Sequence, residues 1–230
     1  PTEKPVGTRL TDVSTEQGAK LALKMAGLPV LIEKVCSSAE LASEFATEIG
    51  FPVVAKIASP DILHKTEMGG VLLNLQDASD VKAGFEKLMT RAQQHAPNAQ
   101  IDGVLITPMV KGGVETILGV QVDPTFGPMI LFGAGGTSVE LFKDVALASA
   151  PLTPASASAL MDKVKSTALL RGWRGSPVAD EAAVVNALCR LSDFAMAHAD
   201  QLQSVDINPL LVQQTGAVCL DAVISLQPCP

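Results

Sequence analysis

Apolar and polar positions along the chain alternate between two periods, which predicts an α/β fold. Segments with apolar residues three to four positions apart, begun by a capping side chain or closed by glycine, are predicted to be helices. Short apolar runs between glycine and proline signals are predicted to be strands. The predicted helices span residues 14–26, 39–49, 77–95, 155–165 and 180–198. The predicted strands span residues 52–57, 71–75, 103–109, 115–122, 128–132, 206–212 and 218–224.

Two of the predicted helices indicate which of their sides is buried. In the first, Leu21, Met25 and Leu28 recur at helical spacing, so we expect them to share a face toward the core. In the last, a stripe at the same spacing is expected to be core rather than a ligand-binding surface. That stripe consists of Val184, Val185, Leu188, Leu191 and Phe194.

Composition and charge narrow the class of protein. A chain of 230 residues that is 47% hydrophobic can bury a full core, and a net charge of -7 is too low for disorder. The acidic balance argues against general nucleic-acid binding. Because no apolar run suits a membrane helix and the N-terminus does not resemble a signal peptide, we expect a soluble cytoplasmic protein. The four cysteines lack metal-site spacing and are expected to be free thiols.

Lys56 is the first candidate for a chemical role. It lies at the end of the otherwise apolar segment 52–57, where a lysine that extends its ammonium to solvent is the simpler explanation. The functional alternative is a point charge held against nucleotide phosphates. The residue alone does not decide between the two.

The polar loop over residues 59–70 is a second candidate. It places His64 beside Lys65 and ahead of Gly69 and Gly70, whose backbone N–H groups can approach an anion. A neutral imidazole is nucleophilic near pH 7, so His64 suits the role of a phosphoryl acceptor. The alternative is a solvated loop histidine without a role.

A tight glycine turn is predicted over residues 133–136, and glycine turns can cradle phosphate. By itself this is a weak signal. Glu140 and Asp144 follow four residues apart and would share one face of a helix. They are equally compatible with ordinary surface acids.

The last two predicted strands, joined through Gln-Thr-Gly, hold a cluster of hard oxygen ligands. Asp206 and Asn208 are two residues apart on a strand and therefore face the same way. Asp221 interrupts an apolar strand, and hairpin pairing would bring it opposite them. Such oxygens suit Mg²⁺ that bridges nucleotide phosphates, which we favour over a simple Asn-Pro turn with an unrelated surface aspartate.

Six segments in a fixed order carry a resemblance to a known family. They are Gly-Phe-Pro-Val-Val-Ala-Lys at 50–56, Ser-Pro-Asp-Ile-Leu-His-Lys at 59–65, Gly-Gly-Val at 69–71, Gly-Val-Gln-Val-Asp-Pro-Thr-Phe-Gly-Pro at 119–128, Phe-Gly-Ala-Gly-Gly at 132–136 and Asp-Ile-Asn-Pro-Leu at 206–210. Together they resemble the ATP-grasp domain of the nucleoside-diphosphate-forming acyl-CoA synthetases. That family includes the β subunit of ADP-forming acetate–CoA ligase and is related to the succinyl-CoA synthetase β subunit. The resemblance extends from about Leu10 to Ile224.

The resemblance implies an ATP-grasp fold, in which two α/β lobes clamp a nucleotide. It divides the chain into a leader or linker over residues 1–12, a first lobe with the phosphate loop over 13–108 and a second lobe with the metal site over 109–230. The matching positions include Lys56 for the ATP phosphates, Gly69 and Gly70 for the phosphate loop, Glu115 near the nucleotide, and Asn208 and Asp221 for Mg²⁺ with Asp206 close by.

The implied reaction is carboxylate + CoA + ATP giving acyl-CoA + ADP + phosphate. His64 matches the histidine that this family uses as a second phosphoryl carrier on the nucleotide-binding subunit. A CoA-binding partner, on which the acyl phosphate forms, is implied as an α subunit or as an N-terminal domain of the same chain. The absence of an initial Met mildly favours the latter.

One departure from the family concerns base recognition. Thr107 and Pro108 stand where many relatives carry Gln-Glu, so recognition of adenine is expected to depend on Met109 or Val110. The choice between ATP and GTP, and the acid used, stay open. Two alternatives to the synthetase are a non-catalytic module of a protein lysine acyltransferase and a carboxylate–amine ligase that uses no phosphohistidine.

Overall fold

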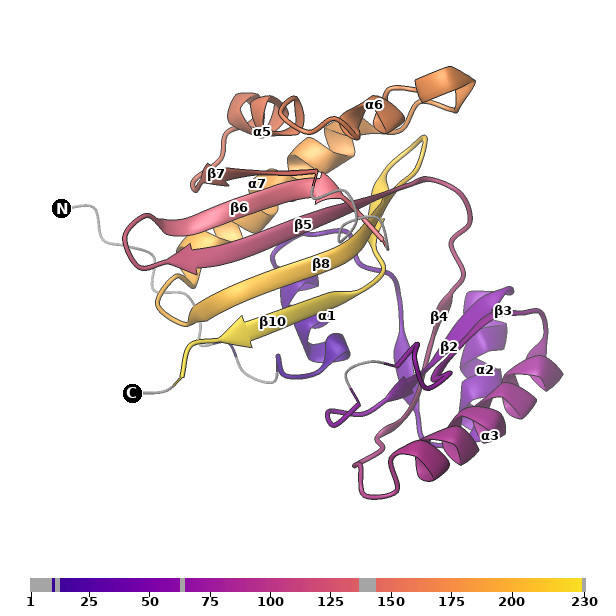
Figure 1. Cartoon of the computed structure of the whole chain (residues 1–230). Helices are drawn as coiled ribbons and strands as arrows, with labels where there is room; N and C mark the ends of the chain where they lie inside the picture. The colour runs from indigo at the N-terminus through magenta and orange to yellow at the C-terminus, as the bar shows by residue number, and fades with distance from the viewer. Residues whose placement is uncertain (1–9, 11–12, 63–64, 137–143, 229–230) are drawn as a thin grey trace. The chain divides into compact units, whose positions relative to one another are not determined.

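A computed structural model describes residues 10, 13–62, 65–136 and 144–228 of the chain. The chain divides into two compact units (Figure 1). Unit 1 comprises Pro1–Val30 and Gly112–Pro230, and unit 2 comprises Leu31–Lys111. Each unit has its own hydrophobic core.

Unit 2 is a four-stranded antiparallel sheet with two helices. The strand order is β1-β4-β2-β3, where the strands are β1 (Lys34–Cys36), β2 (Val53–Ala58), β3 (Val71–Leu75) and β4 (Gly103–Pro108). Helices α2 (Ala39–Ile49) and α3 (Ala78–His95) pack on each other and on the sheet. Alternation along β2 points Ala55 and Ile57 into this core, which also contains Phe85 and Leu88 of α3.

Unit 1 is built on a larger antiparallel sheet with the strand order β10-β8-β5-β6-β7, and β9 pairs with β8. Its strands are β5 (Val114–Asp123), β6 (Gly127–Ala134), β7 (Val145–Ser149), β8 (Leu202–Val212), β9 (Ala217–Cys219) and β10 (Ala222–Leu226). The helices are α1 (Glu16–Met25), α5 (Pro154–Met161), α6 (Thr167–Leu170), the 3₁₀ turn η1 (Trp173–Gly175) and α7 (Glu181–Ala197).

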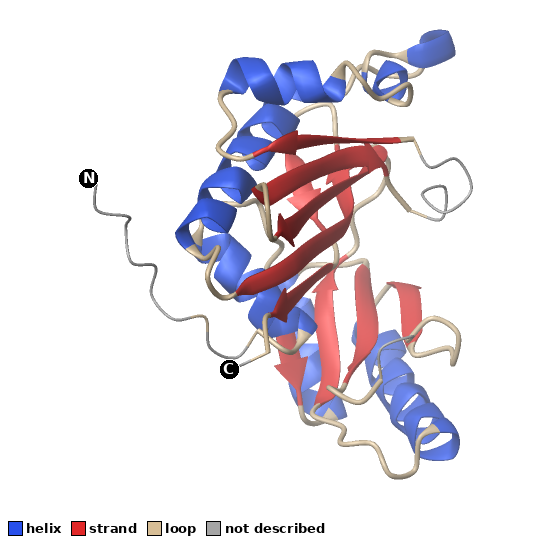
Figure 2. Ribbon diagram, turned by 60° about the vertical axis from the view of Figure 1, so that its left-hand side comes forward, coloured by secondary structure: helices blue, strands red, loops and turns tan. Residues whose placement is uncertain are grey.

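The longer helices of unit 1 lie on one side of its sheet (Figure 2). Leu118 and Phe132 point toward α7 and are buried, as are Val205 and Ile207. Because side chains alternate along a strand, Asp206 points to the opposite face of the sheet.

Most of the elements predicted from the sequence are confirmed. Helix α2 has the predicted bounds, with the Ser38 hydroxyl accepting from the Leu41 N–H, and α3 is likewise capped by Asp77. Helix α5 is shorter than predicted and ends at Met161. The pattern missed β1 and β7, because the first has only three residues and the second alternates small and apolar residues within an Ala/Ser-rich stretch.

The predicted buried face of α1 is wrong at Leu21 and Met25, although Leu28, which follows the helix, is buried as expected. Leu21 and Met25 are 58% and 84% exposed, whereas Ala19, Lys20 and Leu23 are buried. Lys20 tolerates burial because its ammonium pairs at 2.8 Å with Glu16 one turn earlier. Packing of Ala19 and Leu23 into the core of unit 1 therefore determines the buried face, and the pairing compensates the charge of Lys20 there.

The division of the chain also differs from the predicted lobes. The boundary after the fourth strand falls between Lys111 and Gly112, close to the predicted position at residue 108. Helix α1, however, belongs to unit 1 rather than to the unit that follows it in the sequence. The reason is that Ala19, Leu23 and Leu28 pack into the core beneath the larger sheet.

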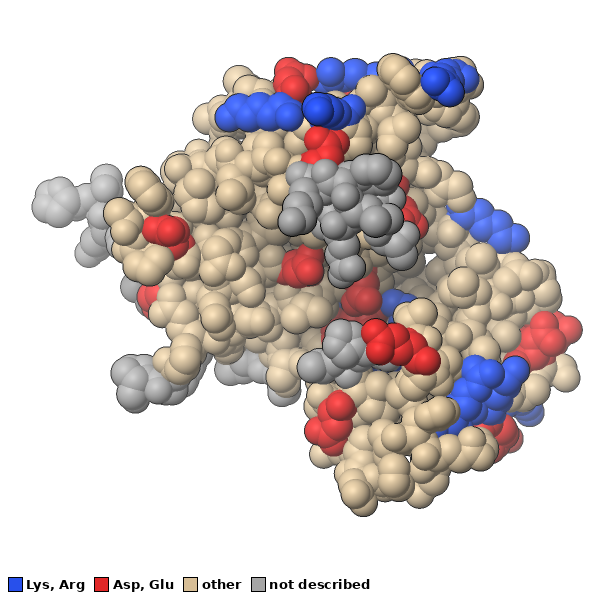
Figure 3. Space-filling model, in the orientation of Figure 1, with Lys and Arg blue, Asp and Glu red and all other residues tan. Residues whose placement is uncertain are grey.

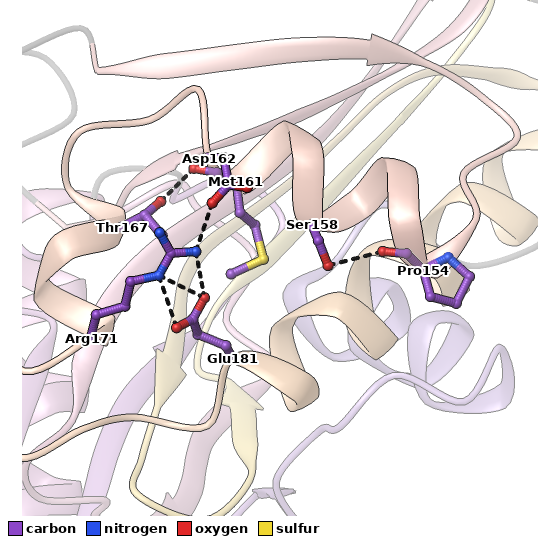
Figure 4. A network of polar contacts seen from close by, with 7 residues as sticks. All are labelled: Pro154, Ser158, Met161, Asp162, Thr167, Arg171 and Glu181. Atoms are coloured by element: carbon purple, nitrogen blue, oxygen red, sulfur yellow. Dashed lines mark hydrogen bonds and ion pairs between the residues drawn. The ribbon is translucent and has the colours of Figure 1, made fainter.

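A polar network fixes the α5–α6 region onto α7 (Figure 4). Arg171 donates to both carboxylate oxygens of Glu181 and, at 2.7 Å, to Asp162. The Thr167 hydroxyl, at the start of α6, donates to the carbonyl of Met161, the last residue of α5, at 2.6 Å. Basic side chains gather on the surface over α5 and α6 (Figure 3), although the chain as a whole is acidic.

The three described cysteines, Cys36, Cys189 and Cys219, are free, as predicted. Burial raises the pKa of the Cys219 thiol to about 12, so it is an inert core group. Among the described residues, no helix is both long and apolar enough to cross a bilayer.

Asp180 joins α7 to the β8–β9 turn. Its two carboxylate oxygens accept from the Ala183 N–H at 3.0 Å and the Gly216 N–H at 2.8 Å. The hydrogen bonds from Gly216 and Ala183 lower the pKa of Asp180. We therefore expect Asp180→Ala to lower the free energy of unfolding by about 1–2 kcal/mol near neutral pH, measured by urea denaturation.

The pH dependence of this loss follows from the lowered pKa. The stabilisation is complete above the unfolded-state pKa of roughly 3.9 and disappears as pH falls through the lower folded-state value. The two stability curves should therefore converge in acid. The control Asp193→Ala removes an exposed carboxylate on the same helix and should change stability little. An Asp180→Ala variant as stable as this control would contradict the account.

Candidate metal and nucleotide site

Strand β8 carries two of the predicted metal ligands at an irregular point in the sheet. It pairs with β5 on one side and with β9 and β10 on the other. On the β5 side Thr116 pairs with Leu210 and Leu118 with Ile207, so Ile117 alone faces Asn208 and Pro209. This is a β-bulge, a feature that re-aims side chains and is common beside active sites.

Asp221 lies across from this bulge, but not on a strand as predicted. The return segment splits into β9 and β10, and Leu220 and Asp221 form the break between them. The Leu220 N–H donates to the Pro209 carbonyl at 3.0 Å, which holds the break against β8. The predicted proximity of Asp221 and Asp206 is confirmed by their electrostatic interaction, although the regular hairpin is not.

The glycine turn completes this end of the sheet. Gly133 and Ala134 continue β6, so the turn begins at Gly135 rather than at Gly133 as predicted. The Gly135 N–H donates to the Glu115 carbonyl at 3.0 Å, and the Gly136 N–H donates to Asn208 Oδ1 at 2.9 Å.

Both positions favour glycine. A Cβ on Gly135 would lie 2.6 Å from the Thr116 backbone, and one on Gly136, whose φ is +66°, would overlap Glu115 Oε2. The turn thus brings Glu115 and Asn208 together at Gly135 and Gly136, a link that the separate sequence motifs did not reveal.

Negative charge is concentrated at this site. Partial burial, together with the nearby charge of Asp221, raises the pKa of the Asp206 carboxyl, while the side chain itself keeps solvent access. Two carboxylates in repulsion, with an amide oxygen beside them, form a hard donor set that favours a divalent cation.

The donor set fits Mg²⁺ that also contacts a substrate. Within the described part of the chain no three His, Cys, Asp or Glu side chains form a metal cage. Mg²⁺ commonly uses one or two carboxylates and completes its shell with water and phosphate oxygens. Asp206, Asn208 and Asp221 match that incomplete kind of site.

Asp144, the second residue of the predicted acidic pair, has a structural role. Glu140 lies outside the described residues. Asp144 accepts hydrogen bonds from the Ser166 and Lys165 N–H groups at 2.6 and 3.0 Å. Partial desolvation raises the pKa of Asp144, but these hydrogen bonds outweigh it and lower the pKa overall. Asp144 therefore ties the start of β7 to the segment between α5 and α6.

The other predicted residues belong to unit 2. Lys56 on β2 is half-buried and points away from Ala55 and Ile57, to the face of the sheet opposite α2 and α3. His64 lies outside the described residues. Met109, which follows β4, donates its N–H to the Pro52 carbonyl at 2.9 Å, so this N–H is already engaged.

The loop before β3 is folded on itself. The Gly69 N–H donates to the Thr66 carbonyl at 3.0 Å, and the Gly70 N–H donates to the Lys65 carbonyl at 2.7 Å. The Gly70 carbonyl in turn accepts from the Ile57 N–H at 2.9 Å, which joins the loop to β2. Both glycine N–H groups that were expected to face an anion are thus engaged within the loop.

Arg91 of α3 also contacts this loop, and the sequence did not predict this contact. Its Nη1 donates to the Gly69 carbonyl at 2.6 Å, across 22 positions of sequence. The pattern gave no signal for this contact, because Arg91 occupies an ordinary polar position of a helix.

The chain belongs to the ATP-grasp family, whose domain model matches residues 8–226. The β subunit of acetate–CoA ligase [ADP-forming] II from Pyrococcus furiosus is 40% identical over 214 residues, which is 92% of this chain and 91% of that protein. A 4-hydroxybutyrate–CoA ligase [ADP-forming] from Nitrosopumilus maritimus is 38% identical over 213 residues, but this chain spans only 30% of its length.

A solved structure is similar over nearly the whole chain. It is the dinucleotide-forming acetyl-coenzyme A synthetase 1 of Ca. Korarchaeum cryptofilum, in complex with coenzyme A, Ca-AMPCP and HgCl⁺. The TM-score is 0.89 at 37% identity, and the match covers 93% of each chain. The predicted ATP-grasp fold is confirmed.

Repulsion between Asp206 and Asp221 makes a testable prediction about the metal-free protein. In buffer with a chelator, Asp206→Asn should raise the free energy of unfolding at pH 7, because it removes one of two like charges. Because the pKa of Asp206 is raised in the folded state, lowering the pH protonates Asp206 in the wild type and removes the repulsion. The difference in unfolding free energy between the variant and the wild type should therefore shrink as pH falls through that raised pKa.

Urea denaturation at several pH values measures this difference. The control Asp193→Asn makes the same replacement at an exposed position of α7 and should show no such trend. An Asp206→Asn protein less stable than wild type at pH 7 would contradict the proposed repulsion.

Proposed function

We propose that this chain is the nucleotide-binding subunit or domain of an ADP-forming acyl-CoA synthetase. The reaction is carboxylate + CoA + ATP giving acyl-CoA + ADP + phosphate. The observation that carries the proposal is the convergence of Glu115, Asp206, Asn208 and Asp221 at one end of the unit 1 sheet. Its support is the family match over almost the whole chain.

Asn208 and Asp221 hold Mg²⁺ in this proposal, with Asp206 as a further or water-mediated ligand. Bound Mg²⁺ supplies charge neutralisation at the nucleotide phosphates. The Gly136 N–H on Asn208 Oδ1 fixes the direction of that oxygen, which retains a second lone pair. Glu115, held beside the same glycine, lies close enough to this centre to contact the nucleotide or its metal shell.

The residues of unit 2 provide the remaining nucleotide contacts. Lys56 supplies a point charge to the phosphates, since it extends from the sheet face that its own helices do not cover. Gly69 and Gly70 form the phosphate loop, and its N–H groups must exchange an internal carbonyl for a phosphate oxygen when nucleotide binds.

Adenine recognition falls to the segment after β4. Met109 contributes its carbonyl, because its N–H is committed to Pro52. Val110, whose N–H has no partner among the described residues, contributes the donor. An acceptor followed by a donor matches the N6 amine and N1 of adenine, which favours ATP over GTP.

His64 is the phosphoryl carrier. In the direction of ATP synthesis, a phosphohistidine on the CoA-binding partner transfers its phosphoryl group to the His64 imidazole, which then passes it to the β-phosphate of ADP. Each step breaks one P–N bond, and the second forms the P–O bond of ATP. Lys56 and the glycine loop hold the nucleotide in line for this transfer.

The CoA-binding partner is an α subunit or another domain of the same polypeptide. Support comes from the family, in which a matching region occurs both as a separate β subunit and within a much longer chain. The small carboxylic acid and CoA bind to that partner. Since ATP and CoA are cytoplasmic metabolites, we place the protein in the cytoplasm.

Labelling with ATP radiolabelled on the γ-phosphate tests the relay. Wild type with Mg²⁺ should acquire an acid-labile, base-stable label, as expected for phosphohistidine. His64→Ala should abolish the label and retain nucleotide binding, because only the acceptor is lost. Asn208→Ala should reduce the label at least about tenfold by removing a metal ligand.

His95→Ala is the matched control, since His95 lies at the exposed C-terminal end of α3. It should label like wild type. Equal labelling of wild type and His64→Ala, or no label on wild type with bound MgATP, would contradict the relay.

A further inference from the structure

We propose that Arg91 is a positioning residue for nucleotide binding, because it fixes the peptide that joins Gly69 to Gly70. The inference rests on the proposed function for the role of the loop, and its geometry lies wholly within unit 2. Nothing in the sequence pattern singles out Arg91. Its role follows from a contact between α3 and a loop 22 residues earlier.

Arg91 sets the direction of the Gly69–Gly70 peptide. Arg91 Nη1 donates to the Gly69 carbonyl at 2.6 Å, a charge-assisted hydrogen bond. In a trans peptide the C=O and the following N–H point in opposite directions. By holding the carbonyl toward α3, Arg91 therefore directs the Gly70 N–H away from that helix, where the Lys65 carbonyl accepts it at 2.7 Å.

The contact with Arg91 also removes rotational freedom from this peptide. Gly69 has a φ of +66°, and glycine has little intrinsic preference between positive and negative φ. Two adjacent glycines consequently allow the joining peptide to rotate at low cost. Without Arg91, the hydrogen bond to the Lys65 carbonyl would be the main restraint on this peptide. A phosphate oxygen that takes the place of this carbonyl would then have to orient the peptide as well as bind it.

Arginine suits this position better than lysine does. A Cβ on Gly69 would lie 2.9 Å from Arg91 Nη1, so the guanidinium lies directly against the loop backbone. Arg91 is half-buried and follows the buried Leu88 by one turn, which fixes the start of its side chain. A planar guanidinium loses less freedom per hydrogen bond than a lysine ammonium on its flexible stem.

The consequence for binding is preorganisation. With the peptide already oriented, a phosphate oxygen can replace the Lys65 carbonyl on the Gly70 N–H without rotation of the backbone. Because the loop is proposed to meet the phosphates remote from adenosine, the effect should fall on ATP and ADP and spare AMP.

The test compares Arg91→Met and Arg91→Lys with wild type by titration calorimetry with MgATP and AMP. Arg91→Met should weaken MgATP binding about tenfold, the effect of losing one hydrogen bond to a charged group, and should leave AMP binding unchanged. Arg91→Lys should recover part of the affinity. Lys87→Met, which removes an exposed charge from the same helix, is the control and should bind like wild type.

Hydrogen exchange of the Gly70 amide gives a second readout that does not depend on nucleotide. It should accelerate in Arg91→Met more than in Lys87→Met, while the amides of β2 keep their protection. Unchanged MgATP affinity with unchanged Gly70 protection in Arg91→Met would overturn the proposal, and so would an equal loss of AMP affinity. If wild type binds no nucleotide, the proposed function fails, and the exchange data still decide whether Arg91 restrains the loop.

Discussion

The register of β8 is the constraint on which the candidate site depends. This strand must pair with β5 along one edge and with both β9 and β10 along the other. The bulge at Asn208 and Pro209 on one side coincides with the break at Leu220 and Asp221 on the other. A one-residue slip would turn Asp206 into the core and Ile207 out of it, so burial of the apolar residues fixes the position of the polar ones.

That register places the carboxylates of Asp206 and Asp221 near each other, which lowers the stability of the folded protein. The raised pKa of Asp206 reflects partial burial and the charge of Asp221. The glycine turn adds a backbone N–H on Asn208 Oδ1 and leaves no room for a side chain next to Glu115. Repulsion between neighbouring carboxylates is expected where a protein binds a cation and a polyanion, because the charge of the bound cation offsets it.

The positions of helices and strands were more predictable from the sequence than the contacts between them. Helices α2 and α3 were predictable because capping side chains, apolar spacing and terminal breakers all agree. The buried face of α1 was not, since the burial of Lys20 depends on its pairing with Glu16 and on packing from strands far along the chain. The split of the last predicted strand was also hidden, because a hydrogen bond from Leu220 to Pro209 determines it.

The same distinction applies to the candidate site. Asp206, Asn208 and Asp221 were recognisable from residue type and spacing, and the fold brings them to one end of the sheet. Their connection to Glu115 through Gly136, and the restraint of Gly69 by Arg91, arise only when segments distant in sequence meet. Residues that only orient other groups of a site are therefore harder to predict from a single sequence than residues that bind the ligand themselves.

The central claim is that the β8 bulge and the facing β9–β10 break form a metal site for a bound nucleotide. A crystal structure of the protein with Mn²⁺ and a non-hydrolysable ATP analogue, using anomalous scattering to locate the metal, tests it most directly. The account predicts a peak within coordination distance of Asn208 Oδ1 and the Asp221 carboxylate, shared with phosphate oxygens. A nucleotide bound with its metal away from both residues would contradict it.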